Sequence, residues 1–192
     1  MPAIPYTIPL PVKELIPCSD LVSFNSMLHG RSHIARVMVH ALRLIQTTGH
    51  LHLEKPLWAG VYLHDIARRH DGSCSMHGEW AIAKWHMNGD IQDMLDAVGV
   101  EAADYPVIET AVIHHCRPEI LPDNPHYTLT ALLKDADGLD RVRLQDLDTK
   151  MLRNPESLLM VDFADRLYQK TARLDHYDPD LMEWVWEVAA RL

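Results

Sequence analysis

The sequence lacks the features that mark a membrane, secreted or nucleic-acid-binding protein. No apolar run approaches the ~20 residues that span a bilayer. The first segment, "MPAIPYTIPLPVKELIPCSD", is broken by prolines and has no basic n-region, so we expect no signal peptide. Three cysteines, Cys18, Cys74 and Cys116, are odd in number and widely spaced, which argues against a disulfide framework and favours a cytoplasmic location.

Basic charge is also scarce. The 18 Lys and Arg residues are outnumbered by 27 Asp and Glu residues, for a formal net charge of −9. No basic stripe is present to neutralise a phosphate backbone. We therefore expect a small-molecule partner, and neither nucleic acid nor a membrane.

Strand signals are few, and helical periodicity dominates. In residues 32–49 the apolar positions lie on one helix face, with Ser32 as the expected N-cap and Gly49 as the expected terminator. Residues 1–18 are expected to form a proline-rich extended arm, and 19–192 a single all-α domain of eight to ten helices. The further expected helices are 20–29, 55–69, 76–89, 90–99, 104–116, 128–144, 155–174 and 178–192.

Histidine, by contrast, is abundant: 13 occur in 192 residues, many at the ends of apolar helical runs. In "VYLHDIARRHDG" an imidazole and a carboxylate, His64 and Asp65, follow directly on an apolar stretch. Burying both is costly unless something pairs with them. A metal ion is one such partner, and a His–Asp hydrogen bond is the simpler alternative.

Seven residues at helix ends form an ordered set of nitrogen and oxygen donors suited to intermediate or hard metal ions. Ligands from different helices converge in the interior of a helix bundle. The set contains two adjacent pairs, although neighbours on a helix lie about 100° apart. In chain order it is His33, His64, Asp65, His77, His114, His115 and Asp137.

This order resembles that of the HD superfamily of metal-dependent phosphohydrolases. "HGRSHIARV" resembles the family's first segment, "LHDIARR" carries the pair that names it, and "DADGLD" resembles its closing segment. The resemblance covers about residues 29–143 and implies an all-α bundle of the HD-domain type. The interval from Asp65 to His77 is shorter than in the cyclic-dinucleotide branch, whose proline and glycine signatures are missing. The chain is closer to small stand-alone bacterial members.

The resemblance implies hydrolysis of a phosphate ester of a nucleotide or another small metabolite, by water activated at one or two divalent ions. Iron or manganese is expected, with cobalt, nickel or magnesium as alternatives. Asp65 would be catalytic, bridging the two ions. The first ion would be held by His33, His64, Asp65 and Asp137, and the second by Asp65, His77, His114 and His115. Two alternatives to this ligand set remain. In one, His77 caps its helix and binds no metal. In the other, one of His114 and His115 lies behind the ligands.

Three residues are expected to contact the substrate. Arg68, which is expected to be catalytic as well, lies nearly one helical turn after Asp65 and suits a phosphate. His29 and Arg31 flank the first ligand, where they either meet substrate or end a helix.

Other residues near the motifs are expected to play no direct part. Cys116 is expected to be a small buried residue and not a thiolate ligand. Asp140 is expected to lie behind the ligands or in solvent. Arg143 is expected either to attract an anionic substrate or to lie on a solvated charged face. Trp184 and Trp186 are expected in the core or in a homodimer contact.

Two other functions fit the same residues. Some proteins of this superfamily use a di-iron pair to activate dioxygen and cleave C–C or C–P bonds, and their ligand order is the same. The chain could also be a non-catalytic metal-binding module. Oxygen uptake and the activity of His64→Ala distinguish these alternatives.

Overall fold

The computed structural model describes residues 5–24, 26 and 28–192, and this part of the chain is helical with no β-strand. The all-α prediction is therefore confirmed. The α-helices are α1 (Arg31–Thr48), α2 (Glu54–Leu63), α3 (His77–Met87), α4 (Gly89–Val98), α5 (Tyr105–His114), α6 (Tyr127–Leu139), α7 (Pro155–Leu158), α8 (Val161–Thr171) and α9 (Leu181–Arg191). Short 3-10 turns lie at Val12–Glu14, Ser19–Leu21, Leu51–Leu53, Ala102–Asp104, Asp140–Leu144 and Thr149–Met151.

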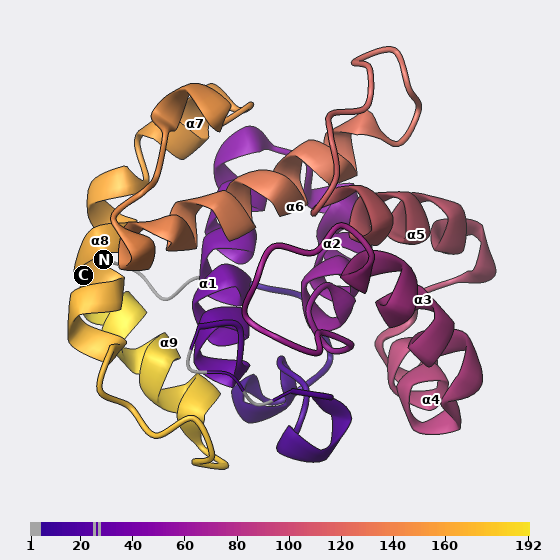
Figure 1. Ribbon diagram of the computed structural model, residues 1–192, viewed down its shortest axis with the longest axis horizontal. Coiled ribbons are helices and arrows are strands. Elements are labelled where there is room, and N and C mark those ends of the chain that lie inside the picture. The colour runs from indigo at the N-terminus through magenta and orange to yellow at the C-terminus, as the bar shows by residue number, and fades with distance from the viewer. Residues whose placement is uncertain (1–4, 25, 27) are drawn as a thin grey trace.

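Helix α1 is the centre of the molecule. It packs against α2, α6 and α9, and it also contacts α7 and α8. In Figure 1, α6 crosses α1, with α3 to α5 on one side and α7 to α9 on the other. Helix α1 ends at Gly49, as predicted, because Gly49 adopts a left-handed conformation (φ 74°). Its N-cap is Gly30, two residues before the expected Ser32.

Three expected helices differ in the structure. The expected helix 55–69 ends at Leu63, so His64 and Asp65 lie in the turns that follow it. The expected helix 128–144 becomes a 3-10 turn from Asp140. The expected helix 155–174 is divided into α7 and α8.

The expected helix 20–29 is wrong for the described part of that segment. Only the 3-10 turn Ser19–Leu21 forms there, and Asn25 and Met27 lie outside the described residues. The Ser26 hydroxyl accepts hydrogen bonds from the backbone N–H groups of Leu28 and His29. A serine side chain that binds nearby backbone in this way competes with helix formation.

The N-terminal arm contributes to the core. Ile8, Leu15 and Ile16 are buried, and the indole N–H of Trp58 in α2 donates a hydrogen bond to the Leu15 carbonyl (3.0 Å). Burial of three aliphatic side chains stabilises the fold by roughly 1.5–3 kcal/mol each. The arm therefore contributes to the bundle's stability.

At the other end of the chain the two tryptophans of α9 differ. Trp186 packs against the core and meets the Tyr6 ring edge-on at 5.3 Å, whereas Trp184 is 48% exposed. Of these two tryptophans, Trp184 is therefore the one exposed enough to contact a second copy of the chain. No helix in the described residues is both long and apolar enough to cross a membrane.

Candidate metal centre

The predicted donors lie where several helices end or begin around α1. His33 is in the first turn of α1, His64 and Asp65 follow α2, and His77 is the first residue of α3. His115 follows α5 directly, and Asp137 lies near the end of α6. All except Asp137 are nearly fully buried, so the donors meet inside the bundle.

A first cluster forms around His33. Its Nε2 atom lies 3.3 Å from His64 Nε2 and 3.2 Å from Asp137 Oδ1. Asp65 Oδ2 lies 3.6 Å from His33 Nε2 and 3.8 Å from His64 Nε2. These four side chains are the ones that the sequence assigned to the first ion.

A second cluster forms around His77. Its Nε2 atom lies 2.8 Å from His115 Nε2 and 3.2 Å from Asp65 Oδ1. His115 Nε2 is 3.8 Å from the same carboxylate oxygen. Asp65 therefore presents one oxygen to each cluster, as a bridging carboxylate would.

The four imidazoles share one orientation: each directs Nδ1 at an oxygen acceptor and Nε2 into a cluster. The acceptors are Asp140 for His33 (2.8 Å), Val61 O for His64 (2.7 Å), Cys74 O for His77 (2.8 Å) and Val112 O for His115 (2.6 Å). An acceptor at Nδ1 requires the N–H there, which leaves a lone pair on Nε2 of a neutral ring. This is the second-sphere arrangement typical of metal-bound histidine.

The clusters therefore need a positive charge. The Nε2 atoms face each other at 2.8 Å in the second cluster and at 3.3 Å in the first. Two lone pairs at these distances repel unless a proton or a metal ion lies between them. Asp65 Oδ1 is buried and accepts no hydrogen bond from the described residues. Burial of an uncompensated carboxylate oxygen is costly, so the donor set fits divalent cations.

The pKa shifts agree with this demand for positive charge. Burial raises the pKa of Asp65, but the imidazoles of His64, His115 and His77 outweigh it and hold that pKa well below its ordinary value. Burial lowers the pKa of His64 to about 4, so this ring stays neutral. Burial lowers the pKa of His77, but Asp65 and Cys116 outweigh it and raise that pKa to about 10, so a proton occupies this ring when no ion does.

His114 is not part of either cluster. Among the described residues, the donor groups whose ligand atoms lie within 4.8 Å of one another are His33, His64 and Asp137, and His77, His115 and Cys116. Of the two adjacent histidines that the sequence proposed, only His115 belongs to a donor group. Cys116, which the sequence analysis set aside, lies beside it.

Arg68 lies at the second cluster. Its side chain is 8% exposed, and Nη1 lies 3.2 Å from His77 Nε2 and 3.6 Å from Asp65 Oδ1. Its Nη2 donates to the Gly72 carbonyl (3.0 Å), and its Nε finds no hydrogen-bond partner in the described chain. The guanidinium therefore faces both the donors and unfilled space.

The other two expected substrate contacts differ. His29 binds Asp71 through Nδ1 (3.0 Å) and lines a cavity at the clusters. Arg31 points away from the centre and donates to the backbone carbonyls of Pro17, His176 and Asp178. Arg31 thus joins distant segments, and we leave it out of the substrate site.

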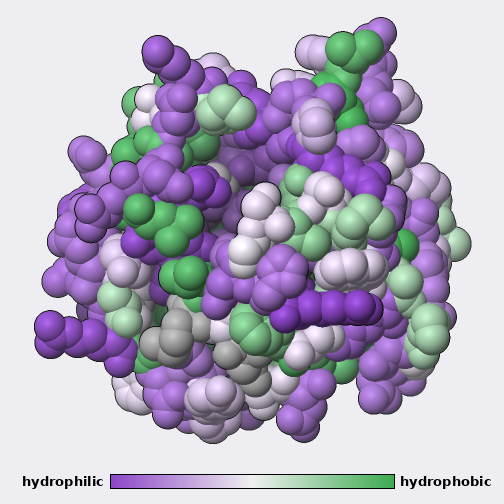
Figure 2. All heavy atoms as spheres, in the orientation of Figure 1, coloured by the Kyte–Doolittle hydropathy of each residue, from purple (hydrophilic) through white to green (hydrophobic). Residues whose placement is uncertain are grey.

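Two cavities adjoin the clusters, and both are lined by His115, Cys116, Asp137 and Arg141. The metal-side cavity, of about 410 Å³, also contacts Asp65 and His77. The outer cavity, of about 520 Å³, extends under the chain between α6 and α7. Figure 2 shows this face hollowed between the α7 side and the loop after α5, with hydrophilic surface around the hollow.

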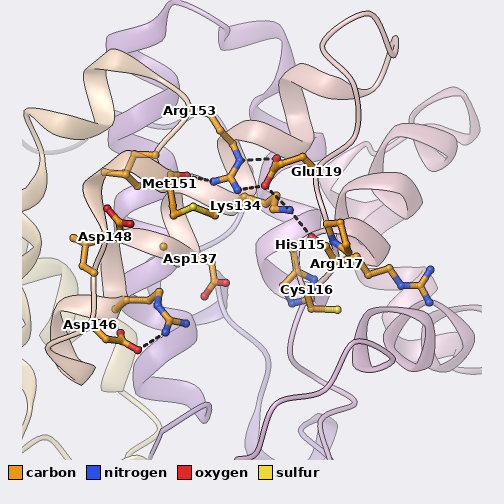
Figure 3. Close-up of a pocket in the computed structure, with 15 residues that line it drawn as sticks. His115, Cys116, Arg117, Glu119, Lys134, Asp137, Asp146, Asp148, Met151 and Arg153 are labelled. Carbon is orange, nitrogen blue, oxygen red and sulfur yellow. Dashed lines mark hydrogen bonds and ion pairs between the residues drawn. The ribbon is translucent and has the colours of Figure 1, made fainter.

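The charges of the outer cavity are neutralised by one another (Figure 3). Glu119 accepts from Arg153 and Lys134, and these cations lower its pKa to about 2. Arg141 pairs with Asp146. Few charges in this cavity remain for a ligand.

The metal-side cavity differs in this respect. Arg68 and Arg143 both line it, and their side chains are nearly buried. Arg143 Nε lies 3.1 Å from Asp140, yet Nε and Nη1 make no hydrogen bond within the described residues. Buried N–H donors without acceptors are costly, so an anion would be stabilised here.

Sequence reasoning left Asp140 either behind the ligands or in solvent, and the structure places it behind His33. Asp140 follows Asp137 by three residues, a spacing that places side chains on one helix face. For Arg143 the sequence left an anion contact and a solvated face as alternatives, and its side chain is nearly buried at the metal-side cavity. Sequence reasoning set Cys116 aside, although its position next to His115 was a signal.

The chain matches no known protein-family model. No curated protein and no solved structure is significantly similar to it either.

Proposed function

We propose that this chain is a metal-dependent phosphohydrolase with an HD-type centre, acting on a phosphate ester of a nucleotide or small metabolite. The observation that carries the proposal is the convergence of four imidazole Nε2 atoms on the two oxygens of one buried carboxylate, Asp65. Asp137 completes the first cluster. The HD assignment rests on the order of these residues in the chain.

One or two divalent ions bound there would act as Lewis acids, activating water and polarising a phosphate oxygen. Nitrogen and carboxylate donors at the first cluster suit iron or manganese, and also cobalt, nickel or magnesium. His33, His64, Asp65 and Asp137 would hold this ion. The side of the centre at Asp137, whose side chain is 31% exposed, is open for a substrate.

The metal-side cavity is the proposed substrate site. Its volume of about 410 Å³ lies within the ordinary range of small-ligand sites, roughly 300–1,000 Å³. Arg68 and Arg143 would bind phosphate oxygens through charge-assisted hydrogen bonds. His29, oriented by Asp71, lies on the same wall.

The first experiment is the metal content per chain after anaerobic purification, for the native protein and His115→Ala. About two ions in the native protein and about one in the variant are expected. One ion in both proteins would show that the second cluster binds no metal, and a single-ion centre would remain. No bound metal in either protein would contradict the proposal.

The second experiment measures hydrolysis of p-nitrophenyl phosphate, bis(p-nitrophenyl) phosphate and a panel of nucleotides by the manganese- or iron-loaded protein. We expect His64→Ala to lose activity by at least a hundredfold, because it removes a ligand of the first ion. His52→Ala, a change at an exposed histidine, is the matched control. Full activity in His64→Ala would contradict the proposal.

The same samples test the alternative chemistry. Oxygen uptake with a candidate substrate, together with a spectroscopic signal from coupled irons, would indicate a di-iron oxygenase instead. Metal binding without either activity would indicate a metal-binding module.

A further inference from the structure

A sulfur atom lies beside the second cluster. Cys116 Sγ and one nitrogen from each of His77 and His115 lie within 4.8 Å of one another. Figure 3 shows Cys116 next to His115 at the edge of the outer cavity. Helix α5 ends at His114, and His115 and Cys116 lie in the turn that follows it.

The two clusters therefore differ by one donor. Each has two imidazole nitrogens and one oxygen of Asp65. The first adds a carboxylate oxygen from Asp137, whereas the second has the Cys116 sulfur nearby. His114, the imidazole that the sequence offered for this place, is in neither group.

We propose that Cys116 is a thiolate ligand at the second cluster, which therefore takes a softer ion of the zinc class while the first takes a harder one. Thiolate ligands select zinc and similar ions, and carboxylate ligands suit manganese and magnesium. The inference rests on the metal centre of the proposed function, and it makes that centre one of two unlike ions.

The spacing of the donors is compatible with one ion. Zinc binds nitrogen at about 2.0–2.1 Å and sulfur at about 2.3 Å, so tetrahedral donors lie about 3.4–3.6 Å apart. The three donor atoms fall within 4.8 Å, and His115 Nε2 is 3.8 Å from Asp65 Oδ1. His77 and His115, at 2.8 Å, would separate slightly around an ion.

Two contacts compete with this role. Cys116 Sγ lies 3.7 Å from the Ile113 carbonyl, a long contact of the kind that satisfies an ordinary thiol. Arg68 Nη1 lies 3.2 Å from His77 Nε2, so its guanidinium would have to give way to the ion. The experiment must therefore report on the sulfur–metal bond itself.

The test adds Co²⁺ to the metal-free, full-length protein and records its absorption. A sulfur-to-cobalt charge-transfer band in the near ultraviolet is expected in the native protein. Cys116→Ser and Cys116→Ala should lose this band, while circular dichroism confirms that they fold. Cys18→Ser is the matched control and should keep the band, because Cys18 is an exposed thiol that belongs to neither donor group.

A zinc titration gives an independent readout. Loss of an outer-sphere partner already costs about 10- to 100-fold in metal affinity, so Cys116→Ser should weaken one of the two ions by about tenfold or more. The other ion should keep its affinity.

The outcomes separate this inference from the proposed function. Two bound cobalt ions without the band, or a band that persists in Cys116→Ser, would overturn the thiolate ligand alone. A band in a protein that hydrolyses no phosphate ester would support the ligand and overturn the activity. No bound cobalt would overturn both.

Discussion

Asp140 connects the candidate metal centre with the fold through a single side chain. It accepts from His33 Nδ1 at 2.8 Å and from Arg36 Nε at 2.6 Å, and it pairs with Arg143 at 3.1 Å. Burial raises its pKa, but Arg36 and His33 outweigh burial and keep the carboxylate ionised. A carboxylate behind a ligand histidine fixes the tautomer and increases its basicity. Asp140 is thus a positioning residue for His33.

His40 gives a prediction about pH. Neither of its ring nitrogens has a hydrogen-bond partner in the described structure, and burial lowers its pKa to about 4 against the opposing effect of Asp140. The unfolded chain, with a histidine pKa of about 6.5, therefore binds the proton more strongly, and stability falls as the pH drops below that value. At pH 5 the loss from this group is about 2 kcal/mol.

We therefore expect His40→Leu to be more stable than the native protein at pH 5, by about 2 kcal/mol, with a much smaller difference at pH 7.5. Urea unfolding at both pH values measures this. His52→Leu, at an exposed site, should change neither curve. An equal effect of His40→Leu at the two pH values would show that His40 does not titrate in this way.

Arg68 gives a prediction about binding. Removing a charge-assisted contact costs about 1.5–3 kcal/mol, so Arg68→Gln should raise the KM for a phosphate ester about 10- to 100-fold. The second ion should bind no more weakly, because a cation 3.6 Å from Asp65 Oδ1 repels it. Arg69→Gln is the control, since Arg69 lies over the Trp80 ring. A loss of the second ion in Arg68→Gln would assign Arg68 a structural role.

At the scale of the elements, close helix contacts bring the donors together. Gly78 follows His77 in α3, and a Cβ there would collide with the Val112 carbonyl of α5. Val112 O is also the acceptor that orients His115. The contact of α3 with α5 therefore sets both the distance between the two histidines and the orientation of one.

Gly78→Ala should separate α3 from α5. We expect a loss of about 1–3 kcal/mol in stability and loss of the second ion, while the first stays bound. Metal content per chain and urea unfolding measure the two effects. Gly89→Ala is the control, because a Cβ at Gly89 has nothing within 4 Å. Two ions retained in Gly78→Ala would show that the contact does not set the second cluster.

Much of the site could be predicted at this scale because polar residues interrupt apolar helical runs. His33, His64, Asp65, His77, His115 and Asp137 were predicted in this way, and the structure brings them together. What failed was side-chain direction. Arg31 lies two residues before His33, about 200° around the helix, and so faces the opposite way.

Helix ends were the other source of error. His114 is the last residue of α5 and His115 the first beyond it, and of the two only His115 belongs to a donor group. The expected helix 55–69 ends early, at Leu63, and the expected helix 155–174 is interrupted between α7 and α8. Periodicity carries no information about those endpoints.

At the scale of the whole molecule, Arg31 joins the N-terminal arm, α1 and the segment before α9. Its guanidinium donates to three carbonyls, those of Pro17, His176 and Asp178. The side chain is buried, so each of these hydrogen bonds matters to stability.

Arg31→Met should therefore lower the free energy of unfolding by about 3 kcal/mol, since three acceptors lose a charged donor. The KM for a phosphate ester should stay unchanged, because Arg31 faces away from the cavity. Urea unfolding and steady-state kinetics measure the two effects. Arg191→Met, at a 75% exposed side chain, should change neither. A raised KM without loss of stability would show that Arg31 contacts the substrate.

The same arginine orders events during synthesis. Asp178 lies 147 positions after Arg31, so the three carbonyls can converge on Arg31 only after that later segment has been synthesised. Arg31 lies two residues before His33, at the start of the helix that supplies the first donor. A nascent chain that lacks residue 178 therefore lacks one of the contacts that fix the start of α1, the helix that bears His33.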